Sequence, residues 1–381
     1  MKILLLSKYE NLGSSSRLRF YQFIPYLREA GIQVQAEALL DNRYVQSLYA
    51  NKHPNALAIL LSFFKRFFYL LKSNTYDLIW IEKELFPWLP AWAEVFLNKI
   101  KVPYVVDYDD AIFHQYDQHG NHIIRKILGK KIDAVMKNAA LVTAGNEYLA
   151  ERARNAGAKN VEIIPTVIDL NRYYMMPKEN DNVFTIGWIG APTTAKYLKL
   201  VEPALKAFFQ DKTQPPKQPS QQTPSKKPDQ PISLDYPYPE AKLLIIGGGK
   251  IDLGDLPVVV RPWREETEAA EINEFDVGIM PLTDGPWERG KCGYKLIQYM
   301  ACGIPVIASP VGVNKQIVKN GVNGFLAQHT QEWVDALNKI YDNPILKEKM
   351  GQQGRMDVEH KYSLQVVLPH LISLLKRFGP K

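Results

Sequence analysis

The chain has 381 residues, of which 46% are hydrophobic, so it is long enough for two α/β domains with cores of their own. Its formal net charge of +7 favours anionic partners such as nucleotide diphosphates or acidic lipid headgroups. Nucleic acid ranks last, because no motif of nucleic-acid recognition stands out and 40 acidic residues are scattered among the basic ones.

Cysteine usage and hydropathy bound the environment of the protein. Cys292 and Cys302 have neither the spacing of a zinc site nor that of a disulfide framework, which predicts reduced thiols in a cytoplasmic protein. The opening apolar run is too short for the core of a signal peptide and is better interpreted as a first strand. No uncharged apolar run approaches the roughly 20 residues needed to cross a bilayer. We expect a cytoplasmic protein that is soluble or peripheral at the inner face of the membrane.

Short apolar runs and helical patterns alternate through residues 1–173, an order typical of a parallel sheet in an α/β fold. The loop after the first strand carries Gly13 and three serines, followed by Arg17 and Arg19. One interpretation of this loop is a serine N-cap with surface arginines. The predicted strands are 3–6, 32–38, 77–81, 102–106, 141–144 and 161–164, and the predicted helices include 18–30, 121–139 and 146–157.

The most apolar segment, residues 55–71, has a broad aromatic stripe at helical spacing. Lys65 and Arg66 lie to one side of it. Two interpretations are open: a helix packed on the N-terminal sheet, which we favour, and a helix lying in the plane of a membrane surface. The stripe consists of Leu57, Leu60, Leu61, Phe64, Phe68 and Leu71.

The strand at 102–106 runs into a cluster of acids that includes Asp109 and Asp110. Ligands of open α/β sheets gather at the carboxyl ends of strands, which is where these side chains would lie. Neighbouring carboxylates repel one another unless a cation or a shared proton relieves them. We expect either sugar or acceptor binding here or a structural helix cap, and we predict no metal ion.

A second set of strands follows a polar linker at 174–182, with predicted strands at 184–189, 242–246, 258–260, 276–280 and 306–308. The loop after the first of them carries Thr193, Thr194 and Lys196. It fits a threonine-capped helix at 195–209, a set of anion-binding donors, or both. Residues 211–240 are rich in proline, glutamine, serine and lysine, which predicts a disordered insertion.

Residues 285–310 read as a glycine-bearing loop, a short helix and a buried strand. Gly290 and Gly293 loosen the backbone ahead of the helix. The first turn of a helix has unpaired N–H groups and a partial positive charge, so it suits an anion. Lys291 and Lys295 lie four residues apart on one face, where like charges repel unless a phosphate lies between them. A solvated basic turn is the alternative.

Residues 300–306, Met-Ala-Cys-Gly-Ile-Pro-Val, carry a resemblance to a known family. The stretch resembles the retaining, glycogen-synthase-like "group 1" glycosyltransferases. That family places two glutamates eight positions apart, the second just before this tail. Here the two positions hold Gly290 and Gln298, so the chain resembles a variant branch without the usual glutamate pair. A glutamine can still bond a ribose hydroxyl pair, without the strength that a carboxylate's charge adds.

The resemblance implies the GT-B fold, in which two Rossmann-like α/β domains face each other across a cleft. Residues 1–173, completed by a C-terminal helix at 363–381, would form the acceptor domain. Residues 183–361 would form the nucleotide-sugar-binding domain, with 211–240 as its insertion.

The resemblance also implies roles for individual residues. Asp109, Asp110, Lys196 and Lys295 would be catalytic, the lysines by neutralising the departing diphosphate and the aspartates by orienting sugar or acceptor. Gln298 would hold the ribose, and Arg261 and Trp263 would lie beside the nucleobase, where a buried tryptophan is the structural alternative. Other expected donor-binding residues are Gly13, Gly190, Thr193, Thr194, Gly290, Lys291, Cys292, Gly293 and Tyr294.

The predicted function is transfer of a sugar from a UDP-, GDP- or ADP-sugar to a hydroxyl of a glycan, lipid-linked or small-molecule acceptor, with no cofactor. Peripheral membrane contact is a further expectation. Two alternatives are a sugar-nucleotide epimerase and a non-catalytic module that binds nucleotide-sugar or an assembly partner. The lost glutamate pair motivates the second of these.

Overall fold

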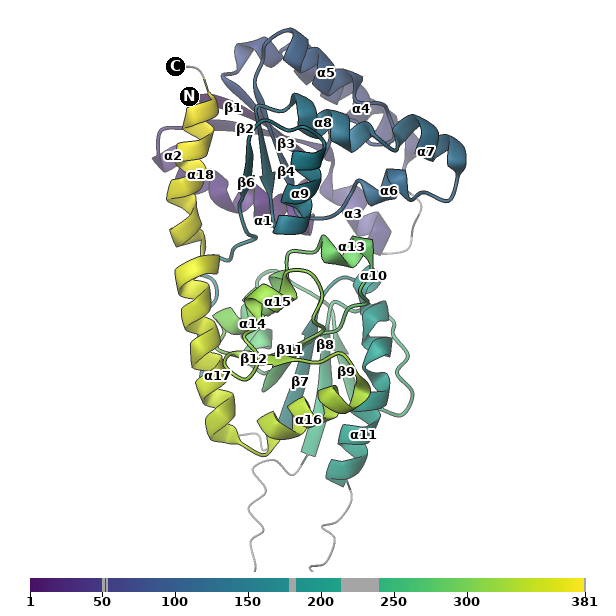
Figure 1. Ribbon diagram of the computed structural model, residues 1–381, viewed down its shortest axis with the longest axis vertical. Coiled ribbons are helices and arrows are strands. Elements are labelled where there is room, and N and C mark those ends of the chain that lie inside the picture. Colours follow the sequence, from purple (N-terminus) through teal and green to yellow (C-terminus); the bar gives the residue numbers. More distant parts are fainter. Residues whose placement is uncertain (50–51, 53, 178–182, 214–239, 380–381) are drawn as a thin grey trace, which may run out of the picture.

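The computed structural model describes residues 1–49, 52, 54–177, 183–213 and 240–379. The chain forms two lobes stacked along its long axis, each built on a six-stranded parallel sheet (Figure 1). This confirms the predicted α/β architecture of two Rossmann-like domains. Among the described residues, no helix combines the length and the apolar character needed to span a membrane.

The N-terminal sheet has the strand order β2-β1-β3-β4-β5-β6, with every neighbouring pair parallel. Its central strands are buried on both faces, which is why they appear in the sequence as continuous apolar runs. The strands are β1 (Lys2–Tyr9), β2 (Gln33–Leu40), β3 (Leu78–Glu82), β4 (Tyr104–Tyr108), β5 (Leu141–Ala144) and β6 (Val161–Ile163).

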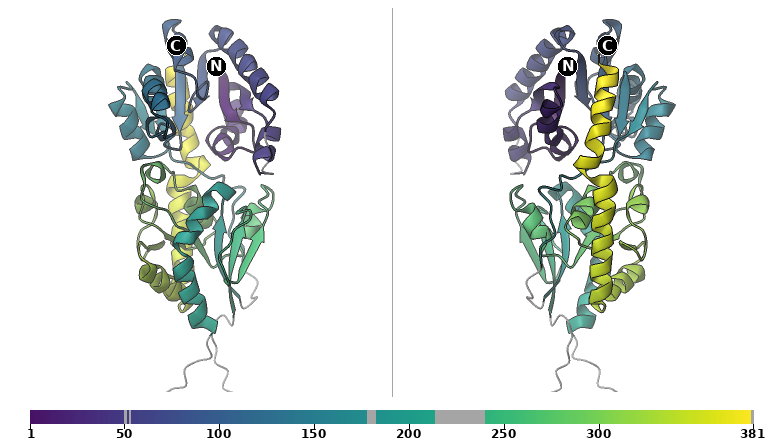
Figure 2. Two further views of the ribbon diagram at one scale, coloured as in Figure 1. Left: turned by 90° about the vertical axis from the view of Figure 1, so that its right-hand side faces the viewer. Right: turned by 90° about the vertical axis from the view of Figure 1, so that its left-hand side faces the viewer.

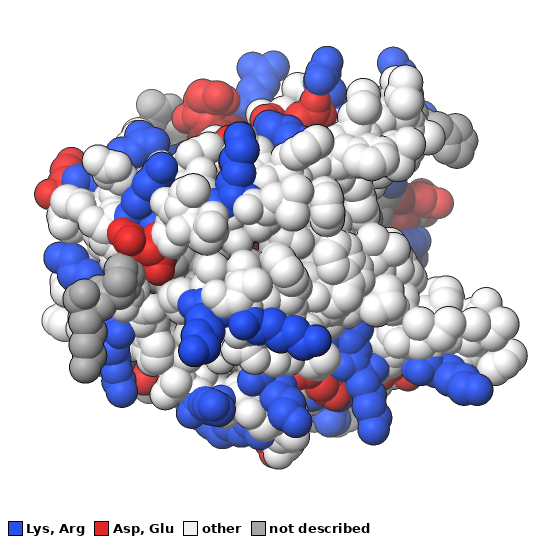
Figure 3. All heavy atoms as spheres, turned by 90° about the horizontal axis from the view of Figure 1, so that it is seen from above, with Lys and Arg blue, Asp and Glu red and all other residues white. Residues whose placement is uncertain are grey.

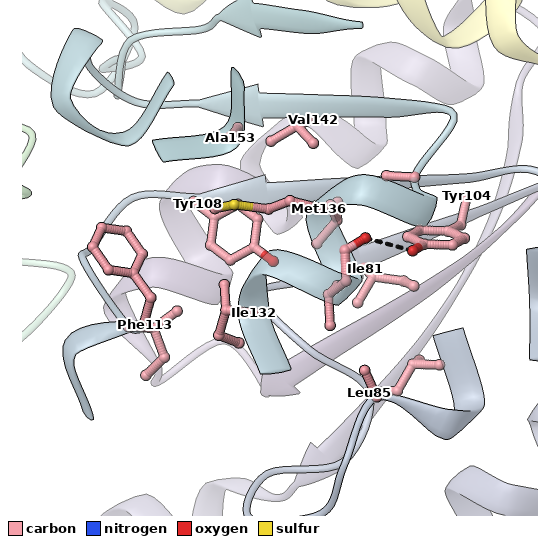
Figure 4. Close-up of a cluster of buried hydrophobic side chains, with 14 of the residues drawn as sticks. Ile81, Leu85, Tyr104, Tyr108, Phe113, Ile132, Met136, Val142 and Ala153 are labelled. Atoms are coloured by element: carbon pink, nitrogen blue, oxygen red, sulfur yellow. Dashed lines mark hydrogen bonds between the residues drawn. The ribbon is translucent and has the colours of Figure 1, made fainter. Parts of the chain in front are cut away.

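Helices cover both faces of this sheet, and a dense core fills the space between it and α8 and α9. Figure 4 shows part of this core, in which Tyr104, Tyr108 and Met136 are fully buried. The Tyr104 hydroxyl donates to the carbonyl oxygen of Val135 at 2.6 Å, so its polar end is satisfied. The helices are α1 (Ser14–Arg19), α2 (Ile24–Glu29), α3 (Asn42–Tyr49), α4 (Ala56–Leu71), α5 (Trp92–Lys99), α6 (His114–Asp117), α7 (His122–Leu128), α8 (Lys131–Asn138) and α9 (Glu147–Asn155).

The C-terminal sheet has the order β12-β11-β10-β7-β8-β9 and is also parallel throughout. Its strands are β7 (Val183–Ile189), β8 (Glu240–Ile246), β9 (Val258–Arg261), β10 (Val277–Met280), β11 (Val306–Ala308) and β12 (Gly324–Leu326). Its helices are α10 (Pro192–Ala195), α11 (Glu202–Thr213), α12 (Glu268–Ile272), α13 (Pro286–Arg289), α14 (Tyr294–Ala301), α15 (Asn314–Ile317), α16 (Thr330–Tyr341) and α17 (Pro344–Asp357).

The last helix, α18 (Leu364–Phe378), returns to the N-terminal lobe. With α17 it forms a column along one side of both lobes (Figure 2, right). Leu364, Leu371 and Leu375 are buried in the same cluster as the β1 residues Ile3 and Leu5. The C-terminal helix therefore completes the core of the N-terminal lobe.

Three predicted helices are shorter or interrupted. The helix expected at 18–30 is broken into α1 and α2 near Pro25, since proline fits the first turn of a new helix better than the interior of one. The helix expected at 121–139 divides into α7 and α8 at Gly129. The sequence also predicts a helix within 309–323, but only Asn314–Ile317 is helical there. Most of the predicted insertion at 211–240 lies outside the described residues, as do residues 178–182 of the predicted linker.

The orientation of α4 differs most from expectation. The helix packs beside the sheet, but the residues it buries are Arg66 and Leu70. The apolar stripe that we expected to face the sheet points outward instead, and Leu57, Phe64 and Phe68 are exposed. Helical periodicity shows that a stripe exists but not which way it faces.

Candidate active site

A cavity of about 1060 Å³ lies between the lobes, at the carboxyl ends of strands from both sheets. Its lining includes residues just beyond β1, β4, β7 and β8. Both sheets therefore place their loops at this one opening, as open parallel sheets do.

The tip of α14 forms one wall of this cavity. Gly293 precedes the helix with φ at +66°, and a Cβ there would lie 2.4 Å from Ile317, so only glycine fits this backbone. No side chain caps the helix start. The first amides of α14 are therefore available to an anion in the cavity.

Lys295 lies on this helix and lines the same cavity. Its ammonium is 5.3 Å from the centre of the Trp188 ring. A Cβ on Gly190 would lie 2.7 Å from Lys295 Cε, so the absence of a side chain at Gly190 leaves room for the side chain of Lys295. Burial and the neighbouring charge of Lys291 lower the pKa of Lys295 to about 8. Among the described residues, no carboxylate lies within ion-pair distance of its ammonium, so the cation is available to a ligand.

Across the cavity, the ammonium of Lys83 offsets the repulsion between the carboxylates that follow β4. Its ammonium lies 2.9 Å from Asp109 Oδ1 and 3.4 Å from Asp110 Oδ2, and it donates to the Ser15 hydroxyl at 3.2 Å. Burial raises the pKa of Asp109, but Lys83 and Ser15 outweigh it and the net pKa is lowered. For Lys83, burial acts downward while Asp109 and Asp110 raise the pKa well above its ordinary value. Asp109 is thus held as an ionised acceptor.

Lys83 was not recognised in the sequence. It follows β3 directly and has φ at +62°, a conformation that non-glycine residues rarely adopt. Such strain is typical of positions whose side chain is aimed at a site. The signal was a lysine flanked by two glutamates at a strand end, and its pairing with Asp109 required the register between β3 and β4.

Gln298 is buried beside a carboxylate from another helix. Its amide nitrogen lies 3.4 Å from Glu268 Oε2 and 3.1 Å from the Tyr173 hydroxyl. Trp263 donates to the same Glu268 oxygen at 2.7 Å, and the hydroxyl of Tyr173 donates to the other. Glu268 itself lines the cavity. A carboxylate is therefore present beside the glutamine, although the sequence pattern lacks it there.

Glu288 also lines the cavity, where the hydroxyl of Tyr197 donates to it. Burial and this bond raise the pKa of Tyr197. In the group 1 family the first of the two glutamates corresponds to Gly290 of this chain. Glu288 lies two residues before that position, and it lines the cavity nevertheless.

Most residues expected at the site line the cavity. They are Asp109, Asp110, Gly190, Thr193, Thr194, Lys196, Trp263, Lys291, Cys292, Gly293, Tyr294, Lys295 and Gln298. Three expected residues do not line the cavity themselves, although chain neighbours of each do. Arg261 pairs with Glu274 at 2.5 and 3.0 Å. Gly13 packs against Tyr9 and Gly290 against Ala111, where a Cβ would clash.

The loop ahead of α14 is held on the N-terminal lobe. Asn146 donates from its amide to the carbonyl oxygens of Gly290 and Lys291, both at 3.0 Å. The buried Cys292 thiol donates to the carbonyl oxygen of Asp109 at 3.1 Å, and burial raises its pKa. Its role here is a contact between lobes. Within the described part of the chain, no three His, Cys, Asp or Glu side chains are grouped so as to hold a metal ion.

Residues 231–343 match the family model "Glycosyl transferases group 1". A D-inositol 3-phosphate glycosyltransferase from Pseudarthrobacter chlorophenolicus is 28% identical over 111 residues, which cover 29% of this chain. The match spans only 25% of the length of that relative.

Solved structures resemble the whole chain. Sucrose-phosphate synthase from Thermosynechococcus elongatus superimposes with a TM-score of 0.67 at 17% identity, over 99% of this chain and 98% of that one. Anabaena HepE in complex with UDP-glucose gives a TM-score of 0.67 at 17% identity, over 99% and 100% of the two chains. At these identities the likeness shows the fold, which is GT-B.

Proposed function

We propose that the protein transfers a sugar from a nucleotide-sugar to a hydroxyl acceptor in the cleft. The match of residues 231–343 to the group 1 glycosyl transferases and the GT-B fold support this function. The observation that carries this proposal is the uncapped tip of α14 with Lys295 beside it, facing the cavity without a counter-ion in the described part of the chain. A diphosphate supplies the anion that this arrangement lacks.

The chemistry follows from where charge develops. As the bond from the sugar to the diphosphate breaks, negative charge grows on the leaving oxygen, and Lys295, Lys291 and the first amides of α14 stabilise it. We infer retention of configuration: the acceptor attacks from the face that the diphosphate leaves, and a phosphate oxygen takes its proton. No side-chain base is then required.

Other residues bind and orient. Gln298 and the neighbouring Glu268 hold the ribose hydroxyls, with Glu268 supplying the carboxylate that position 298 lacks. Trp263 lies beside the base, and the guanidinium of Arg17 lies 4.7 Å from its ring centre. Asp109 and Asp110, which pair with Lys83, accept hydrogen bonds from the sugar or the acceptor.

The pH dependence of donor binding tests the role of Lys295. Its ammonium form is populated below a pKa of about 8 and is lost as the pH rises through that value. A bound diphosphate favours the charged form, so affinity should fall about tenfold per pH unit above 8 until the pKa of the complex is reached. Titration calorimetry between about pH 7 and about pH 9 measures this. In Lys295→Arg the guanidinium stays charged, and the fall should disappear; an equal fall in both proteins would contradict the assignment.

A melting-temperature screen against UDP, GDP, ADP and their common sugars tests donor binding itself. Ligand at about 100 times its Kd stabilises the folded state by about 2.7 kcal/mol, so one nucleotide diphosphate should raise Tm clearly. Its sugar should be transferred to an acceptor or slowly hydrolysed. Binding without transfer or hydrolysis would instead favour a non-catalytic module, and formation of an epimeric sugar without an acceptor would favour an epimerase.

A further inference from the structure

Helix α4 buries Leu70 and packs Phe63 against the core, but it also turns Arg66 inward and a broad apolar stripe outward. The guanidinium of Arg66 is buried and donates to the carbonyl oxygens of Ser7 and Glu37 at 2.5 and 3.1 Å. A surface helix of a globular protein ordinarily does the reverse. The residues of the stripe are between 53% and 63% exposed, and the neighbouring Phe67 is 39% exposed.

The exposed apolar side chains continue beyond α4. The Phe67 ring lies 6.2 Å from that of Trp92 at the start of α5. Trp88, in the loop before α5, lies 5.8 Å from His119, just before α7. We define the apolar face as the stripe of α4 together with Phe67, Trp88, Leu89, Trp92, Phe96, Ile123 and Ile127, all of which are exposed. Contiguous apolar surface of this extent marks an interaction site.

Trp88 is held outward by a strained backbone. Its φ is +65°, an outlier for an aromatic residue, and its side chain is 47% exposed. Its backbone N–H donates to the hydroxyl of the buried Tyr116 at 3.2 Å, which fixes the turn. The fold therefore accepts a cost in backbone energy to keep a tryptophan in solvent.

The charges in the segments that carry the apolar face are mostly basic, although Asp77, Asp117 and Asp133 lie directly beside these segments. Residues 55–76, 88–101 and 118–132 contain a single acid, Glu94. Glu94 is buried and accepts the backbone N–H of Leu85 at 2.8 Å. Figure 3 shows the N-terminal lobe from above, with a broad uncharged area bordered by many Lys and Arg side chains and fewer Asp and Glu side chains. The exposed basic residues in these three segments include Lys72, Lys99, Lys101, Arg125, Lys126 and Lys130.

We propose that the apolar face docks on an anionic lipid bilayer, with α4 lying in the plane of the interface. Aliphatic and aromatic side chains would enter the headgroup boundary, and the flanking lysines would meet lipid phosphates. Tryptophans at the edge of the face fit the interfacial zone, which they favour. A bilayer accommodates a surface made of several helices without the shape match that a protein partner needs, and it fits the scarcity of acids in these three segments. The proposal does not depend on the catalytic function.

Flotation with lipid vesicles tests the proposal without any activity readout. The full chain should float with phosphatidylcholine vesicles that contain phosphatidylglycerol, and less with phosphatidylcholine alone. Phe64→Gln/Phe68→Gln should reduce the bound fraction at least about tenfold, because the variant lacks two aromatic side chains that the bilayer would bury. Ile345→Gln is the matched control: it removes an apolar side chain that is 80% exposed on the C-terminal lobe, and it should float like the wild type.

The charge contribution has a separate variant. Lys99→Glu/Lys126→Glu leaves the apolar side chains in place and should weaken binding to anionic vesicles while removing most of its salt dependence. It also keeps the test open if the phenylalanine variant fails to fold, which melting temperature reports. Failure of the wild type to float, or wild-type flotation by both variants, overturns the proposal. A dimer abolished by Phe64→Gln/Phe68→Gln, without vesicle binding, would instead assign the face to a second copy of the chain.

Discussion

Replacing Lys295 with alanine should lower kcat for sugar transfer by about 100- to 1000-fold, which is the effect of losing one preorganised charge at a developing oxyanion. KM for the donor should change less, because the lysine contributes most when charge has grown on the leaving diphosphate. The helix amides and Lys291 remain in the variant and set its residual rate.

Two controls separate this effect from a loss of structure. Lys199→Ala removes an exposed lysine that pairs with Glu202 at 3.1 Å in the same lobe, and it should leave kcat unchanged. The melting temperature of Lys295→Ala should not fall, since burial lowers the pKa of this lysine and its charge therefore opposes folding. Steady-state kinetics with the nucleotide-sugar identified by the melting screen measures kcat. Turnover within a few-fold of wild type would remove Lys295 from the proposed machinery.

The α/β fold was predictable because each strand and helix has its own pattern within a short stretch of sequence. The strands are buried on both faces and so appear as apolar runs, and their alternation with helical patterns implies a parallel sheet. The tip of α14 was predictable for a similar reason: Gly293 and the two lysines lie within five consecutive residues. The structure also brings Lys196, Asp109 and Asp110 to the same cavity.

The partners of these residues could not be read from the sequence. Lys83 meets Asp110 across 27 positions, and Glu268 meets Gln298 across 30, so each contact depends on sheet register and helix docking. The prediction that the apolar stripe of α4 faces the sheet was wrong for a different reason. A period of 3.6 residues fixes which side chains share a face, but the neighbours of the helix decide whether that face is buried.

The largest effect on stability is expected for Asp107→Ala, in a buried ion pair beneath the site. Arg19 of α1 donates to both carboxylate oxygens of Asp107 at 2.8 and 2.7 Å, and both side chains are almost fully buried. Arg19 also donates to the carbonyl oxygen of Ile164 at 2.8 Å, and Thr143 donates to Asp107 at 2.5 Å. The pair therefore ties α1, and the serine loop at its start, to β4 two residues before Asp109.

Removing the carboxylate leaves the guanidinium buried without its counter-ion, which should cost about 3–5 kcal/mol in unfolding free energy. Urea-induced unfolding measures this. Glu147→Ala breaks the exposed pair with Arg154 and should cost no more than about 1 kcal/mol. The double variant Arg19→Met/Asp107→Leu removes both charges and should recover much of the loss, because the penalty arises from the unpaired charge and not from the absence of a bond. A double variant as unstable as Asp107→Ala would contradict this explanation. The loss of stability would then come from the missing hydrogen bonds with Ile164 and Thr143 and not from an unpaired charge.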